Sequence, residues 1–184
     1  MHVAAGHRLG ASIDRIVKGI IPLTESLPST LFATLHTNYG DIRIQLFPDH
    51  AVKTVRNFVE LAEGTQEANV GKKFYDGLIF HRVIAGFMIQ GGDPTGTGMH
   101  GSDKPNLPAE FSKEPHKRGT ASMARAQSPN SANSQFFICF DDARFLDGQY
   151  TVWGEVTDGM EHIDALPKGE PPREPGKIVK ARAA

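Results

Sequence analysis

The sequence has little that would support cross-linking, membrane insertion or attraction to a polyanion. Cys139 is the single cysteine among 184 residues, which excludes an internal disulfide and fits a reducing compartment. Twenty basic and twenty-one acidic residues leave a net charge of −1, too small to attract nucleic acid or an acidic membrane surface. No apolar run is long enough to span a membrane, and charges interrupt the N-terminal region where a signal peptide needs its apolar segment. We therefore expect a cytoplasmic protein with no nucleic-acid and no membrane partner.

Two regions of the chain differ in periodicity. Residues 1–30 carry apolar side chains at helical spacing and predict a short amphipathic helix that ends at Pro22. Such a helix would pack on its own domain, which is the commonest use of a small apolar stripe, or be an artificial leader, or dock on a partner. From Leu31 onward the period changes to two, and residues 31–184 are expected to form one domain.

The start of this second region predicts a hairpin followed by a helix. The stretch "LFATLHTNYGDIRIQLF" contains two alternating runs around a turn. Residues 48–64 then predict a helix that stops at Gly64. Its apolar stripe consists of Val52, Val55, Val59 and Ala62, with Phe58 alongside.

The rest of the chain predicts more short strands and one more helix. Strands are expected in "LIFHRVIAGFMIQ", "GTASMARAQSPNSANSQFFICF", "QYTVWGEV" and "GKIVKARA", and a short helix begun by Asp158 in "DGMEHIDAL". Many short antiparallel strands with about two helices are typical of a closed barrel or a sandwich.

Two of these strands are apolar on both faces. Alternation places Met88 and Gln90 on one side of the first strand, with Phe87 and Ile89 on the other. The second strand divides in the same way, into Gln135, Phe137 and Cys139 on one side and Phe136, Ile138 and Phe140 on the other. One face of an antiparallel sheet normally meets water, so a second apolar face is expected to line a shallow exterior groove.

Arg82 is the unexpected residue of "FHRVIAGFMIQGGD". An arginine in a strand usually extends to solvent or pairs with a carboxylate, here Asp93. Gln90 and Gln135 nevertheless stand at similar positions in two separate apolar strands. An apolar floor with a few directional polar groups is typical of a small-ligand or peptide site, which favours a functional Arg82.

Other motifs carry less weight. "GTGMHG" at 96–101 satisfies G-x-G-x-x-G, but Pro105 and Pro108 follow where a nucleotide-binding helix would begin. The histidines show no paired ligand spacing, and His81 is expected to face away from the groove as a hydrogen-bonding core residue. Ser134 has no evident base for nucleophilic chemistry. We expect no metal and no cofactor.

Taken together, "FHRVIAGFMIQGGDPTGTG", "ASMARA", "NSQFFICF" and "FLDGQYTVWGEV" resemble a cyclophilin-type peptidyl-prolyl cis-trans isomerase of the bacterial kind. The resemblance runs in order from about residue 31 to the C-terminus. It implies a mainly β fold, a closed eight-stranded antiparallel barrel capped by two helices, with the site on its outer surface. It also implies a monomeric folding catalyst and chaperone whose partners are proline-containing peptides and unfolded or folding proteins.

The resemblance assigns site residues motif by motif. Arg82 matches the catalytic arginine, and Phe87 and Gln90 match further catalytic positions. The substrate-binding positions are Met88, Ala124, Arg125, Ala126, Gln135, Phe137, Phe145, Leu146 and Tyr150. The best-known animal pattern has asparagine at Arg125, tryptophan at Phe145 and histidine at Tyr150. Because the tryptophan contributes to cyclosporin binding in the family, a reduced affinity for cyclosporin is expected.

A second hypothesis is a non-catalytic module that holds proline peptides without turnover. An apolar groove alone would serve such a module, whereas a cation beside the groove serves catalysis. The presence of Arg82 therefore favours the enzyme.

Overall fold

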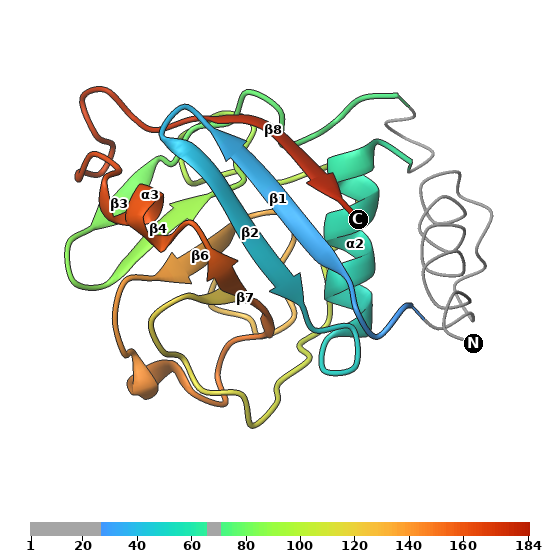
Figure 1. Ribbon diagram of the computed structural model, residues 1–184. Coiled ribbons are helices and arrows are strands. Elements are labelled where there is room, and N and C mark those ends of the chain that lie inside the picture. Colours follow the sequence, from blue (N-terminus) through green and yellow to red (C-terminus); the bar gives the residue numbers. More distant parts are fainter. Residues whose placement is uncertain (1–26, 66–70) are drawn as a thin grey trace, which may run out of the picture.

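The computed structural model describes residues 27–65 and 71–184, so the helix expected before Pro22 lies outside the described residues. One antiparallel sheet of eight strands, ordered β3-β4-β6-β5-β7-β2-β1-β8, curls around an apolar core (Figure 1). The strands are β1 (Phe32–Thr37), β2 (Gly40–Leu46), β3 (Arg82–Ile84), β4 (Met88–Gly91), β5 (Thr120–Met123), β6 (Phe136–Cys139), β7 (Val152–Asp158) and β8 (Ile178–Ala183). The helical elements are α2 (Val52–Glu63), α3 (Met160–Asp164) and the 3₁₀ turn η2 (Arg144–Leu146). In the two described ranges, no helix combines the length and apolarity that crossing a bilayer requires.

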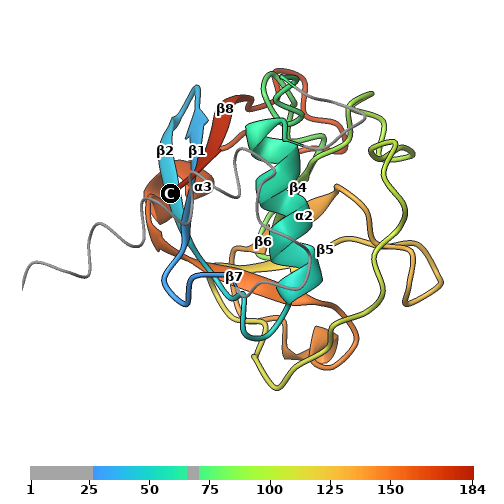
Figure 2. The ribbon, with the colours of Figure 1, turned by 90° about the vertical axis from the view of Figure 1, so that its right-hand side faces the viewer.

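The predicted hairpin and the helix predicted in residues 48–64 are confirmed. Strands β1 and β2 pair antiparallel, and their register ends at Thr37 opposite Gly40. Helix α2 covers one open side of the curled sheet (Figure 2) and ends at Gly64, which adopts the left-handed conformation with φ 70°. Val52, however, is 43% exposed, so the buried stripe begins only at Val55.

The start of α2 also differs from the local signals in the sequence. Ala51 offers no side-chain cap; instead the Glu110 carboxylate accepts hydrogen bonds from the backbone N–H groups of Lys53 and Thr54. The first turn is therefore held from a distant loop rather than by the local Pro48 and Asp49 signals. The short helix predicted in "DGMEHIDAL" is present as α3, but its N-cap is Gly159 and Asp158 remains in β7.

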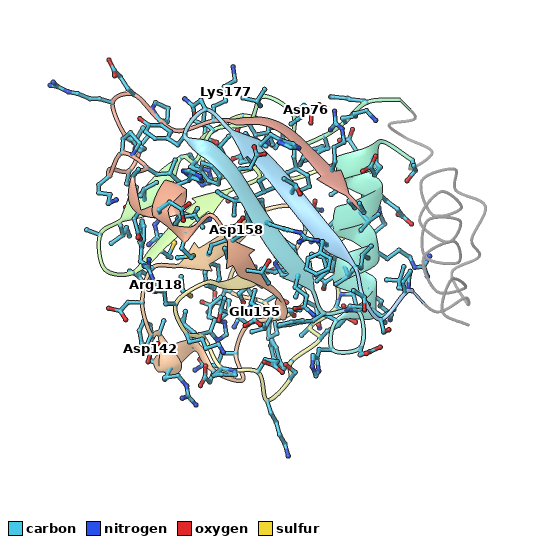
Figure 3. The ribbon with its side chains drawn as sticks, viewed as in Figure 1. Asp76, Arg118, Asp142, Glu155, Asp158 and Lys177 are labelled. Carbon is cyan, nitrogen blue, oxygen red and sulfur yellow. The ribbon has the colours of Figure 1, made fainter. Side chains whose placement is uncertain are left out.

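The sheet forms a half-barrel. Regular pairing runs from β3 round to β8. The segments flanking these two strands are joined by the isolated bridges Ile79–Lys177 and Val83–Gly169, and by backbone hydrogen bonds such as the one from the Phe80 N–H to the Gly176 carbonyl. Prolines that lack an N–H donor crowd the segment before β8, which limits a continuous ladder there. Asp76, labelled beside β8 in Figure 3, accepts hydrogen bonds of 2.9 Å from both terminal nitrogens of Arg182. The eight antiparallel strands and two helices were predicted correctly, while the regular strand pairing stops short of full closure.

Two separate apolar clusters occupy the two faces of β4 and β6, as the alternation predicts. The inner cluster fills the half-barrel and includes Ile89, Phe136 and Ile138. The outer cluster consists of Met88, Phe137, Cys139, Ala143 and Leu146, with Ile84, Phe87, Ala124 and Tyr150 packed against it. Phe87 is the exception to the alternation: β4 begins only at Met88, so Phe87 belongs to the preceding turn and joins the outer cluster.

Candidate active site

A groove of about 170 Å³ opens over the outer cluster. Nine of the residues assigned from the sequence line it together: Arg82, Phe87, Met88, Gln90, Ala124, Arg125, Phe137, Leu146 and Tyr150. They come from β3, the turn between β3 and β4, β4, β6, η2 and the segments that follow β5 and η2. Antiparallel pairing makes this possible, because it places Arg82 opposite Gln90 and Gln90 opposite Phe137.

Arg82 lies at the edge of this groove and is held by two side chains. Its Nη1 donates a hydrogen bond of 3.2 Å to Gln90 Oε1. Its Nε lies 3.0 Å from Glu170 Oε1 as an ion pair that lacks hydrogen-bond alignment. Among the described residues, no protein group accepts a hydrogen bond from Nη2. The guanidinium is therefore oriented while one edge remains available to a ligand.

The Arg82–Asp93 pair considered from the sequence is not formed. The Asp93 carboxylate instead accepts hydrogen bonds from Thr95 and from the His100 backbone, which shape the loop after β4. Burial raises the pKa of Asp93, but these hydrogen bonds outweigh it and lower the pKa to about 2. The polar contact expected for His81 is also missing, because neither ring nitrogen has a hydrogen-bond partner among the described residues.

Gln90 and Gln135 extend the hydrogen bonding in one direction away from Arg82. Gln90 accepts from Arg82 through its oxygen and donates through Nε2 to Gln135 Oε1 at 2.9 Å. Gln135 in turn donates to the backbone carbonyls of Gly98 and His100 at 3.0 and 2.9 Å. The side-chain amides of Gln90 and Gln135 therefore each accept one hydrogen bond and donate others, which fixes Gln90 Oε1 toward Arg82.

The groove floor is apolar and includes packed aromatic side chains. Phe137 is 5% exposed and lies edge-on to Tyr150, with 5.8 Å between the ring centroids. Phe87 packs near Phe145 at the rim, with 5.7 Å between centroids. Phe145 itself does not line the groove and is 68% exposed, so it lies beside the groove floor rather than in it.

Arg125 is bonded internally. Its Nε and Nη2 donate to the Gln149 carbonyl at 3.1 and 2.9 Å, and its Nη1 donates to the carbonyls of Ala126 and Gln127 at 3.0 Å each. The guanidinium carbon also lies 4.7 Å from the centroid of the Tyr150 ring. Arg125 thus joins the segment after β5 to the segment after η2, and these form two walls of the groove.

A second, more polar hollow of about 350 Å³ adjoins the groove. It shares Gln90, Ala124 and Arg125 with the groove, and it contains two of the three assigned residues that the groove lacks, Ala126 and Gln135. Sequence analysis did not assign the loop residues that form its far wall, Met99, His100 and Asn133. A peptide lying across Arg125 would therefore meet an apolar site on one side and a polar site on the other.

The site is suited to binding and to charge stabilisation rather than to covalent chemistry. Burial raises the pKa of the Cys139 thiol to about 12, which keeps it protonated. Ser134 is fully buried and donates its hydroxyl to the Gly92 carbonyl. In residues 27–65 and 71–184, no three histidine, cysteine, aspartate or glutamate side chains gather where they could hold a metal ion. What the groove offers a ligand is an apolar bed beside one oriented cation.

Sequence analysis also missed Glu170, which pairs with Arg82. It lies in "PKGEPPREPG", which has no helical or strand periodicity, and it reaches Arg82 only because this segment folds back beside β3 at the Val83–Gly169 bridge. A contact between residues 82 and 170 depends on tertiary structure, so no local pattern could have indicated it.

Comparison with known proteins gives a consistent result. The sequence profile of the family described as "Cyclophilin type peptidyl-prolyl cis-trans isomerase/CLD" matches residues 32–183. A probable peptidyl-prolyl cis-trans isomerase of Brucella suis biovar 1 (strain 1330) is 48% identical over 158 residues, which cover 77% of this chain and 76% of that protein. Peptidyl-prolyl cis-trans isomerase A of Mycobacterium tuberculosis (strain CDC 1551 / Oshkosh) is 49% identical over 160 residues, covering 79% and 85%.

Solved structures show the same likeness. A cyclophilin-type isomerase of Cryptosporidium parvum, crystallised in the presence of the dipeptide Ala-Pro, superimposes with a TM-score of 0.74 at 32% identity, covering 83% of this chain and 98% of that chain. A cyclophilin from Hirschia baltica gives a TM-score of 0.71 at 27% identity, covering 84% and 76%.

Proposed function

The chain belongs to the cyclophilin-type peptidyl-prolyl cis-trans isomerases, and on that premise we propose that Arg82 is its catalytic residue and that the groove beside Arg82 binds the X–Pro segment. The family's reaction is rotation about the peptide bond that precedes proline. The observation that supports this assignment is the position of the oriented guanidinium at the edge of the apolar bed.

The reaction needs no covalent intermediate. Partial double-bond character gives the amide a rotation barrier of roughly 18 to 20 kcal/mol, so uncatalysed X–Pro isomerisation takes tens of seconds or longer. At the twisted midpoint the conjugation is lost, and the proline nitrogen becomes pyramidal with a localised electron pair. An enzyme accelerates the rotation by binding that form more tightly than either planar isomer.

Arg82 can supply this difference in binding. Its guanidinium stays charged, and the contacts with Gln90 and Glu170 leave Nη2 for the electron pair of the twisted nitrogen. A fixed donor costs little reorganisation when the charge develops. Each tenfold gain in rate requires about 1.4 kcal/mol, so one such contact can account for a large part of the acceleration.

The remaining residues hold the peptide. Met88, Phe137 and Leu146 form the bed for the proline ring, with Phe87 at the side. Gln90 and the backbone of Ala124 to Ala126 bind the chain, Gln135 orients Gln90, and Tyr150 closes the wall that Arg125 braces. A ring held in this way stays still while the preceding carbonyl turns.

The proposed ligands are proline-containing peptides and folding proteins. The Cryptosporidium parvum relative was crystallised with a dipeptide that ends in proline, and the groove described above has the apolar bed that such a residue requires. A monomeric state, a cytoplasmic location, a chaperone role and weakened cyclosporin binding stay predictions.

Exchange between the isomers of a short X–Pro peptide, measured by NMR, tests the assignment. We expect wild-type protein to accelerate exchange and Arg82→Ala to lose on the order of 100-fold of that acceleration while keeping a folded spectrum. Arg118→Ala is the matched control, because Arg118 is an exposed arginine that pairs with Asp164 outside the groove (Figure 3). Peptide binding by wild type without faster exchange would support the non-catalytic module, and near-normal activity in folded Arg82→Ala would remove Arg82 from the mechanism.

A further inference from the structure

A buried histidine lies directly behind the groove floor. The His116 side chain is 0% exposed, and its ring lies nearly parallel to Phe137, at an interplanar angle of 17° and a centroid distance of 6.0 Å. The same ring meets Tyr150 edge-on at 6.3 Å. His116 thus contacts the floor and one wall of the groove without lining it.

Both ring nitrogens of His116 have a partner. Nδ1 lies 3.1 Å from Asp147 Oδ1, which also accepts the His116 backbone N–H at 2.7 Å. Nε2 lies 2.9 Å from the Ser122 hydroxyl in β5. In addition, the His116 carbonyl accepts the Ala143 backbone N–H at 3.0 Å. The residue therefore joins β5 to the segment that contains η2.

Counting protons assigns the tautomer of the ring. Arg144, followed by the His116 backbone, lowers the pKa of Asp147 to about 2, so the carboxylate can only accept and Nδ1 must carry the hydrogen. Burial lowers the pKa of His116 against the opposing effect of Asp147, which keeps the ring neutral and leaves Nε2 as an acceptor.

Ser122 can satisfy that acceptor. Its single hydroxyl hydrogen has two possible acceptors, His116 Nε2 and the Thr151 carbonyl at 3.0 Å. The Thr151 carbonyl already accepts the Met123 backbone N–H at 2.9 Å. The hydroxyl hydrogen is therefore available to Nε2, and every group in the series is satisfied.

We propose that His116 is a positioning residue of this isomerase: Asp147 holds its neutral ring as the Nδ1–H tautomer, and the ring in turn fixes the positions of Phe137 and Tyr150 in the groove. The inference rests on the proposed function, because it concerns the floor on which the proline ring would lie. His116 acts through these two rings and touches no substrate.

The tautomer gives a readout that does not depend on activity. In wild-type protein, two-bond ¹H–¹⁵N correlations of the histidine rings should identify His116 as a neutral Nδ1–H ring. In Asp147→Ala the acceptor at Nδ1 is lost, and the ring should change to the Nε2–H tautomer that donates to Ser122, freeing the Ser122 hydrogen for Thr151. A wild-type ring that is already Nε2–H, or doubly protonated at neutral pH, would overturn the proposal.

Activity completes the test. We expect kcat/KM on an X–Pro peptide to fall about tenfold in Asp147→Ala, and also in His116→Phe, which keeps an aromatic ring but loses both hydrogen bonds. Arg144→Gln is the matched control, because it removes the other side-chain partner of Asp147. In this variant His116 should remain the Nδ1–H tautomer, and kcat/KM should stay within twofold of wild type. If Asp147→Ala changes the tautomer of His116 but leaves kcat/KM unchanged, the positioning role is overturned. Wild-type protein with the expected tautomer but no isomerase activity would instead overturn the proposed function.

Discussion

The two faces of β4 and β6 are built from alternate residues of the same strands, yet their surroundings differ. Phe136 faces inward and meets Phe58, Tyr75 and Trp153, with ring centroids 5.8 to 6.1 Å away. Its neighbour Phe137 faces outward, packs on His116 and Tyr150, and leaves one side open to the groove. Phe136 on the inner face is packed among three aromatic rings, whereas Phe137 on the outer face borders the groove that we propose as the peptide site.

This comparison indicates that stability and activity are separable along a strand. Alternation places successive residues on opposite sides, so one residue can be changed while the backbone hydrogen bonds of its neighbour stay intact. Substitutions on the inner face should then affect the free energy of unfolding, and those on the outer face should affect catalysis.

Phe136→Ala should have the largest effect. Phe136 is fully buried among three other aromatic rings, and removing such a side chain typically costs about 3 to 5 kcal/mol because a cavity remains. Urea denaturation would measure the loss, and protein that stays folded should keep a kcat/KM near wild type. A loss below about 1 kcal/mol would show that the inner face is far more adaptable than its packing indicates.

Phe137→Ala should show the opposite balance. The side chain lies against the groove, where water or a neighbouring ring can occupy the space, so we expect about half the stability loss of Phe136→Ala. Without its bed the proline ring is poorly held, and kcat/KM should fall at least about tenfold, equivalent to about 1.4 kcal/mol. The peptide exchange assay measures this. Equal stability losses in the two variants, with activity retained in both, would contradict the division between the faces.

Local patterns predicted this division well, and they failed where tertiary contacts decide. The alternation in "NSQFFICF" correctly separated Phe137 from Phe136, because the period of a strand is a local property. Phe87 was assigned to the wrong face by alternation, since β4 starts one residue later. Val52 was expected to be buried, but α2 starts against the distant Glu110.

The same limit applies to the site. The motif residues of the groove come together because strand register brings Arg82, Gln90 and Phe137 side by side. Glu170 and His116 contact them from loops with no periodicity, so their contribution emerges only from the folded chain. Motifs therefore identified the residues that line the groove better than the residues that lie behind them.

Lowering the pH should reduce the free energy of unfolding. Burial lowers the pKa of His116 and of His81 in the folded protein, although Asp147 and Asp93 oppose it. As the pH falls below about 6.5 the unfolded chain takes up these protons first, so it binds more protons than the native state and the free energy of unfolding decreases. Each group contributes at most about 1.4 kcal/mol per pH unit in this window.

Urea denaturation at pH 7.5, 6 and 5 would check this prediction. We expect a net loss on the order of 1 kcal/mol between the first and last conditions, smaller than the loss in Phe136→Ala. His116→Phe should reduce the pH dependence, since it removes one of the two groups. Stability that rises toward pH 5 would mean that these histidines become charged in the native state more easily than in the unfolded chain.

Arg125→Ala should give the smallest change and sharpens the comparison at the wall of the groove. Within the part of the chain that the structure describes, Arg125 bonds only backbone carbonyls and contacts the Tyr150 face, so its loss should loosen the wall equally for planar and twisted peptide. Interactions shared by ground and transition states change KM and leave kcat alone. We expect KM to rise about threefold, equivalent to roughly 0.7 kcal/mol, with kcat unchanged.

Steady-state kinetics on an X–Pro peptide would measure this change in KM. Arg125→Lys keeps the charge but not the planar fork, so its KM should lie between those of wild type and Arg125→Ala. A fall in kcat instead would mean that this wall stabilises the twisted state, so that catalysis would depend on it as well as on the apolar floor and Arg82.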